Sequence, residues 1–189
     1  MLLDFSWTVI VRRFDGSGDY NRSWDEYKQG FGDASGEYWL GNEYLHYLTS
    51  SRAYKLRFDL EDWDGNTRYA EYSSFVVNSE ADNYRLLLGD YSGNASSSPY
   101  SDTISGFLYH NNSQFTTWDR DNDARWDTNC GYEFGGFWFV TCLRVGLTNH
   151  YRFPGVSYPN VSEWSTIRWD DWGGHAYSLK TMVMKMRPL

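Results

Sequence analysis

The clearest pattern along the chain is the alternation of apolar and charged residues at 54–60, Tyr-Lys-Leu-Arg-Phe-Asp-Leu. A period of two is typical of a strand that buries one face. A β-branched run at 7–12, followed by turn-forming residues at 15–18, predicts another strand. Residues 69–77 and 84–88 are predicted as strands next to 54–60. The first half of the chain therefore predicts a sheet.

Short helices are predicted between these strands. Ser23 and Glu26 have the spacing of a capping box, and Gly30 is placed to end the helix that follows. A second helix is predicted from Asn42 to Leu48, and a third begins at Ser79.

The periodicity disappears after Gly89. From 90 to 177, Gly, Ser, Asn, Asp and aromatic residues dominate. A loop region this long is usually functional or disordered, and its aromatic content argues against disorder. Alternation returns at 178–187, with three methionines on one face. A terminal strand after this long segment indicates that the end of the chain returns to the first sheet, so we expect a sheet region from 1–89 and 178–189 with a loop-rich region between them.

Composition indicates that aromatic residues build the core. The 189 residues are 20% aromatic, with 10 Trp and 16 Tyr, and include 17 Gly. This length suffices for one sizeable domain or two small ones. Most of the aromatic side chains are expected to pack the core, and the others are candidates for stacking against a carbohydrate or a peptide.

Charge and hydropathy exclude two classes of partner. The net charge is −8 and no basic run occurs, which argues against nucleic acid. No segment approaches the roughly 18 apolar residues of a membrane span. Met1 to Phe5 is too short for a secretory signal. We therefore expect Met1 to be a start residue added to a domain cut from a longer precursor.

The chain has two cysteines, Cys130 and Cys142. If they are bonded, they close a short loop, and the chain-entropy estimate gives a stabilisation of the fold of about 3 kcal/mol. Neither lies in a C-x-x-C pair or at zinc-ligand spacing from a histidine, so a metal-thiolate site is not expected. Four glycosylation sequons favour a secreted protein. They begin at Asn21, Asn94, Asn111 and Asn160.

The most unusual polar segment places Asp119, Asp121 and Asp123 at alternate positions. In an extended chain these carboxylates share a face and repel one another unless a cation lies among them. Ca²⁺ takes roughly 6–8 oxygen ligands, so one interpretation is a calcium loop and the other is a solvated acidic turn. An EF-hand is excluded, because Ala124 and Cys130 replace its glycine and its glutamate.

Several segments, in order and spacing, resemble one known family. The matching segments are 7–17, 27–32, 36–42, 56–60, 110–112, 115–117, 119–123 and 184–188. They are similar to the C-terminal globular domain of fibrinogen, which also occurs in ficolins, tachylectins, tenascins and angiopoietins. The resemblance extends over nearly the whole chain, 1–189. It implies an α+β domain with a central, mainly antiparallel sheet, short helices and a loop-rich calcium- and ligand-binding region at 90–177. Because the family's domains normally begin further upstream, with another disulfide, we expect an N-terminal piece to be missing.

The resemblance implies a disulfide between Cys130 and Cys142 and a bound Ca²⁺. Side chains and backbone carbonyls share the metal in this family, and Asp119 is expected to be a neighbour of the ligands. The implied metal ligands are Asp121, Asp123, Arg125 and Asp127, with Trp126 as an alternative to Asp127. Family members assemble through upstream segments, so oligomers of this chain are expected only through such segments.

The lectin branch of the family has an acetyl-binding pocket beside the calcium. The implied ligand-binding residues are Phe134 (or Glu133), Trp138, Thr141, Cys142, Leu143, Tyr158 and Pro159. In these lectins a cis peptide bond precedes the second cysteine, so Thr141–Cys142 is expected to be cis. Leu143 stands where the lectins have a histidine. Without that hydrogen-bond donor, weak selectivity for N-acetyl sugars is expected.

These features predict a secreted, extracellular recognition domain. The main interpretation is lectin-like binding of glycans or acetylated microbial surface groups in innate immunity. The alternative is a protein-binding module of the adhesion or receptor-ligand type. An enzyme is not predicted, since no catalytic motif surrounds Glu133 or Glu163 and the four histidines form no catalytic pattern. His110 is expected to be a structural hydrogen-bonding residue.

Overall fold

The computed structural model describes residues 6–96 and 106–189. Met1 to Phe5, with the expectation made for Met1, and residues 97–105 of the loop-rich region lie outside the described residues. Within the described ranges, no helix is both long and apolar enough to cross a membrane.

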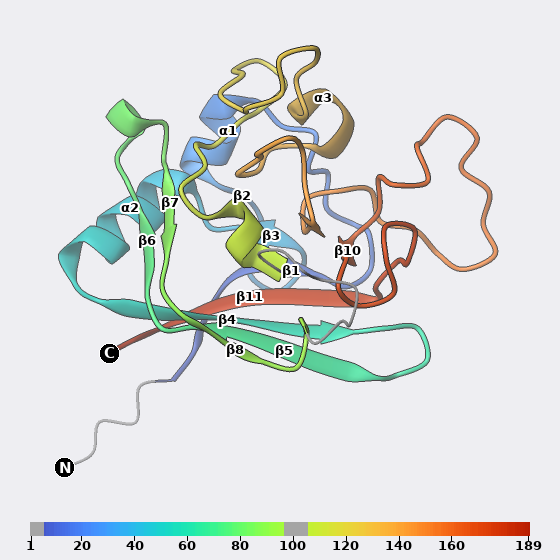
Figure 1. Ribbon diagram of the computed structural model, residues 1–189, viewed down its shortest axis with the longest axis horizontal. Coiled ribbons are helices and arrows are strands. Elements are labelled where there is room, and N and C mark those ends of the chain that lie inside the picture. The colour runs from blue at the N-terminus through green and yellow to red at the C-terminus, as the bar shows by residue number, and fades with distance from the viewer. Residues whose placement is uncertain (1–5, 97–105) are drawn as a thin grey trace.

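A seven-stranded sheet forms the base of the molecule, below the helices and loops in Figure 1. In spatial order its strands are β2 (Phe31–Gly32), β3 (Tyr38–Trp39), β1 (Thr8–Arg13), β11 (Thr181–Pro188), β4 (Tyr54–Glu61), β5 (Thr67–Tyr72) and β8 (Tyr91–Gly93). All of these pairings are antiparallel. The C-terminal strand lies between β1 and β4, which confirms that the end of the chain returns to the first sheet.

Alternation along β4 gives the sheet one buried face. Leu56, Phe58 and Leu60 point into the core, and the charged residues between them point away from it. The register of β4 with β11 continues this face through the methionines of the last strand. The opposed pairs are Leu56 with Met186, Phe58 with Met184 and Leu60 with Met182.

The helices begin where the sequence predicts. In α1 (Trp24–Gln29), Ser23 and Glu26 form the capping box, and Gly30 follows the last turn with a φ of 88°. The second helix, α2 (Asn42–Ser51), is longer than predicted. The third is one 3₁₀ turn, η1 (Glu80–Asp82). α1 and α2 lie above the sheet in Figure 1.

The predicted strand 69–77 is divided by a bend after Tyr72. Beyond it, β6 (Phe75–Val77) pairs with β7 (Leu86–Leu88) in a separate two-stranded sheet. The prediction that 84–88 lies beside 54–60 is therefore wrong. β6 lies against α2 instead. The Val77 N–H in β6 donates to the buried hydroxyl of Thr49 in α2 at 3.0 Å.

The region 90–177 is mostly irregular, as predicted, with a few short elements. These are β8, η2 (Gly106–His110), α3 (Gly131–Phe134), β9 (Val145–Gly146) and β10 (Arg168–Trp169). Because β8 pairs with β5, the sheet extends past residue 89. Aromatic rings join this region to the sheet: Trp169 packs on Phe58 at 5.3 Å, and Trp138 lies 5.8 Å from Trp39.

Candidate functional site

The predicted disulfide is present between Cys130 and Cys142. Their Cα atoms are 5.4 Å apart, and both residues are buried. The bond joins the end of the acidic loop 119–129 to the segment that leads into β9. The acidic loop is therefore held at its C-terminal end by a covalent link to the core.

Asp119 fixes the other end of the acidic loop. Its Oδ1 accepts hydrogen bonds from the Trp24 N–H at 2.9 Å and from the Thr117 hydroxyl at 2.7 Å. The first bond ties the loop to the start of α1. These contacts give Asp119 a structural role beside the two predicted ligand carboxylates.

Asp121 and Asp123 form an acidic pair within this loop. Asp123 accepts from the backbone N–H groups of Arg125 at 2.7 Å and of Cys130 at 2.8 Å, and its own N–H donates to Asp121 at 3.2 Å. Burial, opposed by these backbone bonds and assisted by the charge of Asp121, raises the pKa of Asp123. A cation beside the pair would offset this repulsion.

The donor set at this pair fits Ca²⁺ in kind, since the ion prefers carboxylate and carbonyl oxygens. Among residues 6–96 and 106–189, no three His, Cys, Asp or Glu side chains gather in a metal-binding group. Backbone carbonyls would therefore have to complete the coordination. The side chains of Arg125 and Asp127 pair with each other at 2.7 Å, so their contribution falls to the backbone.

His110 supports the segment after the disulfide from within the core. Its Nδ1 lies 2.7 Å from the Trp138 carbonyl, and its Nε2 accepts from the backbone N–H groups of Arg144 and Val145. Burial lowers the pKa of His110 to about 3, so the ring is neutral and Nδ1 carries the hydrogen. The expectation that His110 is a structural hydrogen-bonding residue is confirmed.

The residues predicted for the acetyl pocket do not share one surface. Phe134, Trp138, Cys142 and Leu143 are all buried. Trp138 is fully enclosed, and its Nε1 donates to the Tyr84 carbonyl at 2.7 Å, so it belongs to the core. Burial prevents contact between its ring and a ligand in this conformation.

The predicted cis bond before Cys142 is wrong, because the described residues contain no cis peptide. The chain reverses here by another means. Cys142 has a φ of 71°, and its carbonyl accepts from the Val140 N–H at 3.1 Å. Thr141 is left exposed between them, with its hydroxyl 2.9 Å from that of Tyr109.

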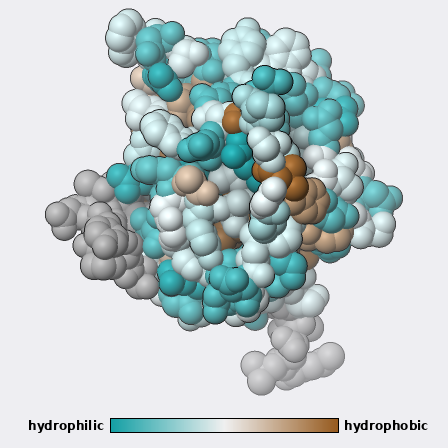
Figure 2. All heavy atoms as spheres, turned by 90° about the vertical axis from the view of Figure 1, so that its right-hand side faces the viewer, coloured by the Kyte–Doolittle hydropathy of each residue, from teal (hydrophilic) through white to brown (hydrophobic). Residues whose placement is uncertain are grey.

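Tyr158 lines a different pocket, between the loop at 150–162 and the turn from β4 to β5. This pocket has a volume of about 330 Å³ and is walled by Trp63, Phe153, Tyr158 and Tyr177. The Tyr158 hydroxyl accepts from the Phe153 N–H at 3.1 Å. Figure 2 shows this side of the molecule, where apolar atoms gather beside a hollow. Pro159 is exposed on the same loop.

The loop at 150–162 approaches the β4–β5 turn because aromatic rings hold it there. The Trp63 ring lies 6.0 Å from Tyr151 and 5.9 Å from Phe153. Arg152 closes the loop on itself by donating to the carbonyls of Val161 and Ser162. These contacts hold Tyr158 among the rings of this loop.

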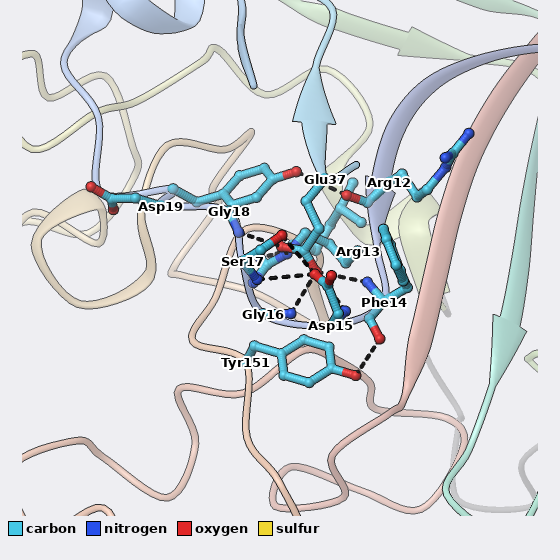
Figure 3. A network of polar contacts seen from close by, with 12 residues as sticks. Arg12, Arg13, Phe14, Asp15, Gly16, Ser17, Gly18, Asp19, Glu37 and Tyr151 are labelled. Carbon is cyan, nitrogen blue, oxygen red and sulfur yellow. Dashed lines mark hydrogen bonds and ion pairs between the residues drawn. The ribbon is translucent and has the colours of Figure 1, made fainter. Parts of the chain in front are cut away.

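A polar network that the sequence did not reveal lies near α3. Figure 3 shows the Glu37 carboxylate surrounded by the turn that follows β1. It accepts from Arg13 Nε at 3.0 Å and from four backbone N–H groups. A pocket of about 240 Å³ lies next to this network, with Glu133 and Phe134 on its α3 side. The pair joins the last residue of β1 to the residue just before β3, and no local sequence pattern indicates this contact.

Exposed aromatic rings also escaped the sequence prediction. They lie on the acidic loop, on α3 and on the segment before β10. We call Trp118, Trp126, Tyr132 and Trp164 the loop surface; Trp126 is 95% exposed and Tyr132 is 71% exposed. Large rings on a protein surface are enriched at interaction sites.

A sheet-based domain with a disulfide-anchored loop and an exposed aromatic surface is typical of an extracellular recognition module. Comparison with known proteins agrees. The chain belongs to the family described as fibrinogen beta and gamma chains, C-terminal globular domain, whose sequence model matches residues 4–189.

Two relatives illustrate the range of the family. The human fibrinogen alpha chain is 42% identical over 97% of this chain, which spans 22% of that protein. Bovine angiopoietin-related protein 7 is 42% identical over 96% of this chain, which spans 50% of that protein. The chain thus corresponds to half or less of each of these relatives.

Solved structures show the same fold. The fibrinogen-like globe domain of human ANGPTL2 has a TM-score of 0.85 and 43% identity, with 96% of this chain and 80% of that chain covered. Lamprey fibrin D-dimer, complexed with the peptide Gly-His-Arg-Pro-amide, has a TM-score of 0.85 and 34% identity. The match covers 100% of this chain and 63% of that chain. Fibrinogen-like domains are non-enzymatic binding modules, so the prediction of no catalysis is confirmed.

Proposed function

We propose that this chain is an extracellular, calcium-binding recognition domain whose ligand is a protein or a peptide. The observation that carries the proposal is the loop surface, because exposed aromatic rings anchor protein interfaces by burying large areas at low entropic cost. Similarity to known proteins supports the same class of ligand. The chain resembles angiopoietin-related proteins, and one structural neighbour is complexed with a peptide.

The disulfide supports the extracellular location. Disulfides form and persist in oxidising compartments and are rare in the cytosol. The bond between Cys130 and Cys142 closes the segment that carries Tyr132 and anchors the end of the acidic loop, which carries Trp126. An oxidising environment would therefore preserve the shape of the proposed interface as well as the fold.

Calcium would organise the same surface. Asp121 and Asp123 lie in the acidic loop, which begins directly after Trp118 and carries Trp126. A cation held by this pair would cross-link the loop internally and reduce its freedom before a partner arrives. Pre-organisation of this kind raises affinity by lowering the entropic cost of association.

The proposal is tested by binding to an array of extracellular receptor ectodomains and matrix proteins. For any partner found, the double variant Trp126→Ala/Tyr132→Ala should lose at least about tenfold in affinity. The control is Tyr44→Ala/Tyr47→Ala, which removes two exposed rings from α2. Equal losses in both variants, or binding that survives both, would show that the loop surface is not the interface.

The Tyr158 pocket favours a second candidate function, which is the binding of glycans or acetylated surface groups. Aromatic walls suit the apolar faces of sugar rings, and Asp64 and Arg152 add polar groups at the same pocket. A glycan array with and without chelator provides the test. Tyr158→Ala should abolish any glycan signal, and a signal unchanged in that variant would exclude the pocket.

A further inference from the structure

The outer face of the large sheet places positive charges directly opposite one another. In the register of β4 with β11, Lys55 opposes Arg187 and Arg57 opposes Lys185. All four point away from the core, because residues such as Leu56 and Phe58, between them in the alternation, are buried. Like charges directly opposite each other destabilise a sheet. The stability of the strands therefore does not explain this arrangement.

Neighbouring carboxylates compensate only part of this charge. Arg57 pairs with Asp59 at 2.6 Å and with Glu71 at 2.7 Å. Asp59 also pairs with Lys185, and Glu71 lies 3.3 Å from Lys55. Four basic side chains thus share two carboxylates, which leaves an excess of two positive charges on a chain whose net charge is −8.

Arg187 is the least compensated of the four. No carboxylate pairs with it among the described residues, and its guanidinium lies 5.1 Å from the centre of the Trp7 ring. Lys55 and Lys185 approach the same ring at 5.3 and 5.6 Å. The negative face of one ring offsets only part of the repulsion among three cations. A bound anion would offset the remaining positive charge.

We propose that this face, formed by Trp7, Lys55, Arg57, Lys185 and Arg187 and here called the basic face, binds a sulfated polysaccharide. Residues two apart on a strand are separated by about 6.6–6.8 Å, and neighbouring strands by about 4.7–4.9 Å. The sheet therefore presents a regularly spaced array of cations to an extended polyanion. Guanidinium groups suit its sulfates, because their planar donor forks match tetrahedral oxyanions.

A sulfated chain fits this face better than an acidic protein does. Protein interfaces rely on an apolar centre surrounded by polar groups. The large rings at the basic face are Trp7, which three cations approach, and the neighbouring Tyr69, which the Arg57 guanidinium covers at 4.4 Å. A hydrophilic polyanion needs charge and contact along its length and no apolar centre.

The basic face is separate from the proposed protein-binding surface. In Figure 1 the acidic loop and α3 lie at one end of the molecule, and β4 and β11 form its base with the C-terminus close by. The two surfaces can therefore be occupied together. A sulfated matrix would hold the domain while the loop surface stays free. The two proposals are therefore independent, and an experiment can contradict one without the other.

Binding to immobilised heparin at low ionic strength tests the proposal. Lys55→Gln/Arg187→Gln should lower affinity at least about tenfold and reduce the slope of log K against log salt by about two, one for each cation removed. The control is Arg22→Gln/Lys28→Gln, which removes the same charge near α1 and should change affinity by less than about twofold.

Circular dichroism and the melting temperature check that the variants fold. If the double variant does not fold, Arg187→Gln alone replaces it, with an expected loss of about threefold or more. The proposal is overturned if the wild type does not bind heparin, if the control loses as much as the test variant, or if desulfated heparin binds equally well. Preference for phosphatidylserine vesicles or for polyglutamate over heparin would also overturn it.

Discussion

The Glu37 carboxylate accepts hydrogen bonds from the backbone of the turn that follows β1. Three N–H groups of the turn, from Phe14 to Gly16, donate to Oε1, while the Gly18 N–H and Arg13 Nε donate to Oε2 (Figure 3). Gly16 has a φ of 76°, a backbone conformation that residues other than glycine rarely adopt. Burial opposes ionisation of Glu37, but Arg13 and the backbone donors outweigh it and lower the pKa.

Glu37→Gln should destabilise the fold by about 3–5 kcal/mol, because it leaves the buried Arg13 charge without its partner. Chemical denaturation measures the loss, and Glu163→Gln, at an exposed loop position, is the control with an expected change within about 0.5 kcal/mol. A Glu37 variant as stable as the control would show that the network contributes nothing to folding.

His110 makes the fold sensitive to mild acid. Its pKa is lowered to about 3 by burial, against an unfolded value of about 6.5, so the unfolded chain binds the proton more readily. The neutral ring's contribution is fully present above pH 6.5 and is lost progressively as the pH falls towards 3. Between pH 7 and pH 5 the free energy of unfolding should fall by about 2 kcal/mol from this residue.

Urea denaturation of the wild type and of His110→Gln at both pH values checks this prediction. The variant should be less stable overall, because glutamine cannot reproduce the ring's packing and hydrogen bonds. Its stability should nevertheless change less between pH 7 and pH 5. The same pH dependence in both proteins would assign the effect to another group.

At the scale of elements, the acidic loop depends on contacts at both ends. Asp119 ties it to α1 through the Trp24 N–H, and Cys130 ties it to Cys142. Between these points the repulsion of Asp121 and Asp123 favours a bound cation. A cation bound at this pair would therefore couple to the positions of Trp118, just before the loop, and of Trp126 within it.

Chelator should lower the melting temperature of the wild type. A metal that binds only the folded state stabilises it by about 2.7 kcal/mol at a hundredfold excess over the dissociation constant. Asp121→Ala should already melt at a lower temperature and should respond little to chelator, whereas the exposed control Asp25→Ala should behave like the wild type. Equal chelator shifts in all three proteins would place the metal elsewhere.

At the scale of the whole molecule, one aromatic core joins the sheet to the loop region. Trp138 packs against Trp39, Phe107, Phe115 and Phe137. Rings from the sheet side and from the loop region therefore share a single packed interior, and the two regions are expected to unfold together.

Trp138→Ala should cost about 3–5 kcal/mol in one cooperative transition, since a large buried ring is removed. Fluorescence and far-UV circular dichroism should report the same midpoint. A variant of unchanged stability that had lost only ligand binding would instead identify Trp138 as a pocket wall.

The sequence determined the features that depend on neighbouring residues. The alternation in β4 and in β11 and the capping box of α1 are visible because period-two patterns and caps involve positions a few residues apart. The family resemblance added the fold and the disulfide between Cys130 and Cys142. These predictions hold because each needs only local geometry or the ordered spacing of several motifs.

Only the tertiary structure decided which surfaces these elements present. In the structure Trp138 is buried, Tyr158 lies in a pocket beside Trp63, and the predicted strand 69–77 is divided after Tyr72. The tertiary structure also assembled a basic face from β4 and β11, although no basic run occurs in the chain. Such surfaces arise from pairing between distant segments, where register and packing select which side chains meet, and no local pattern encodes that choice.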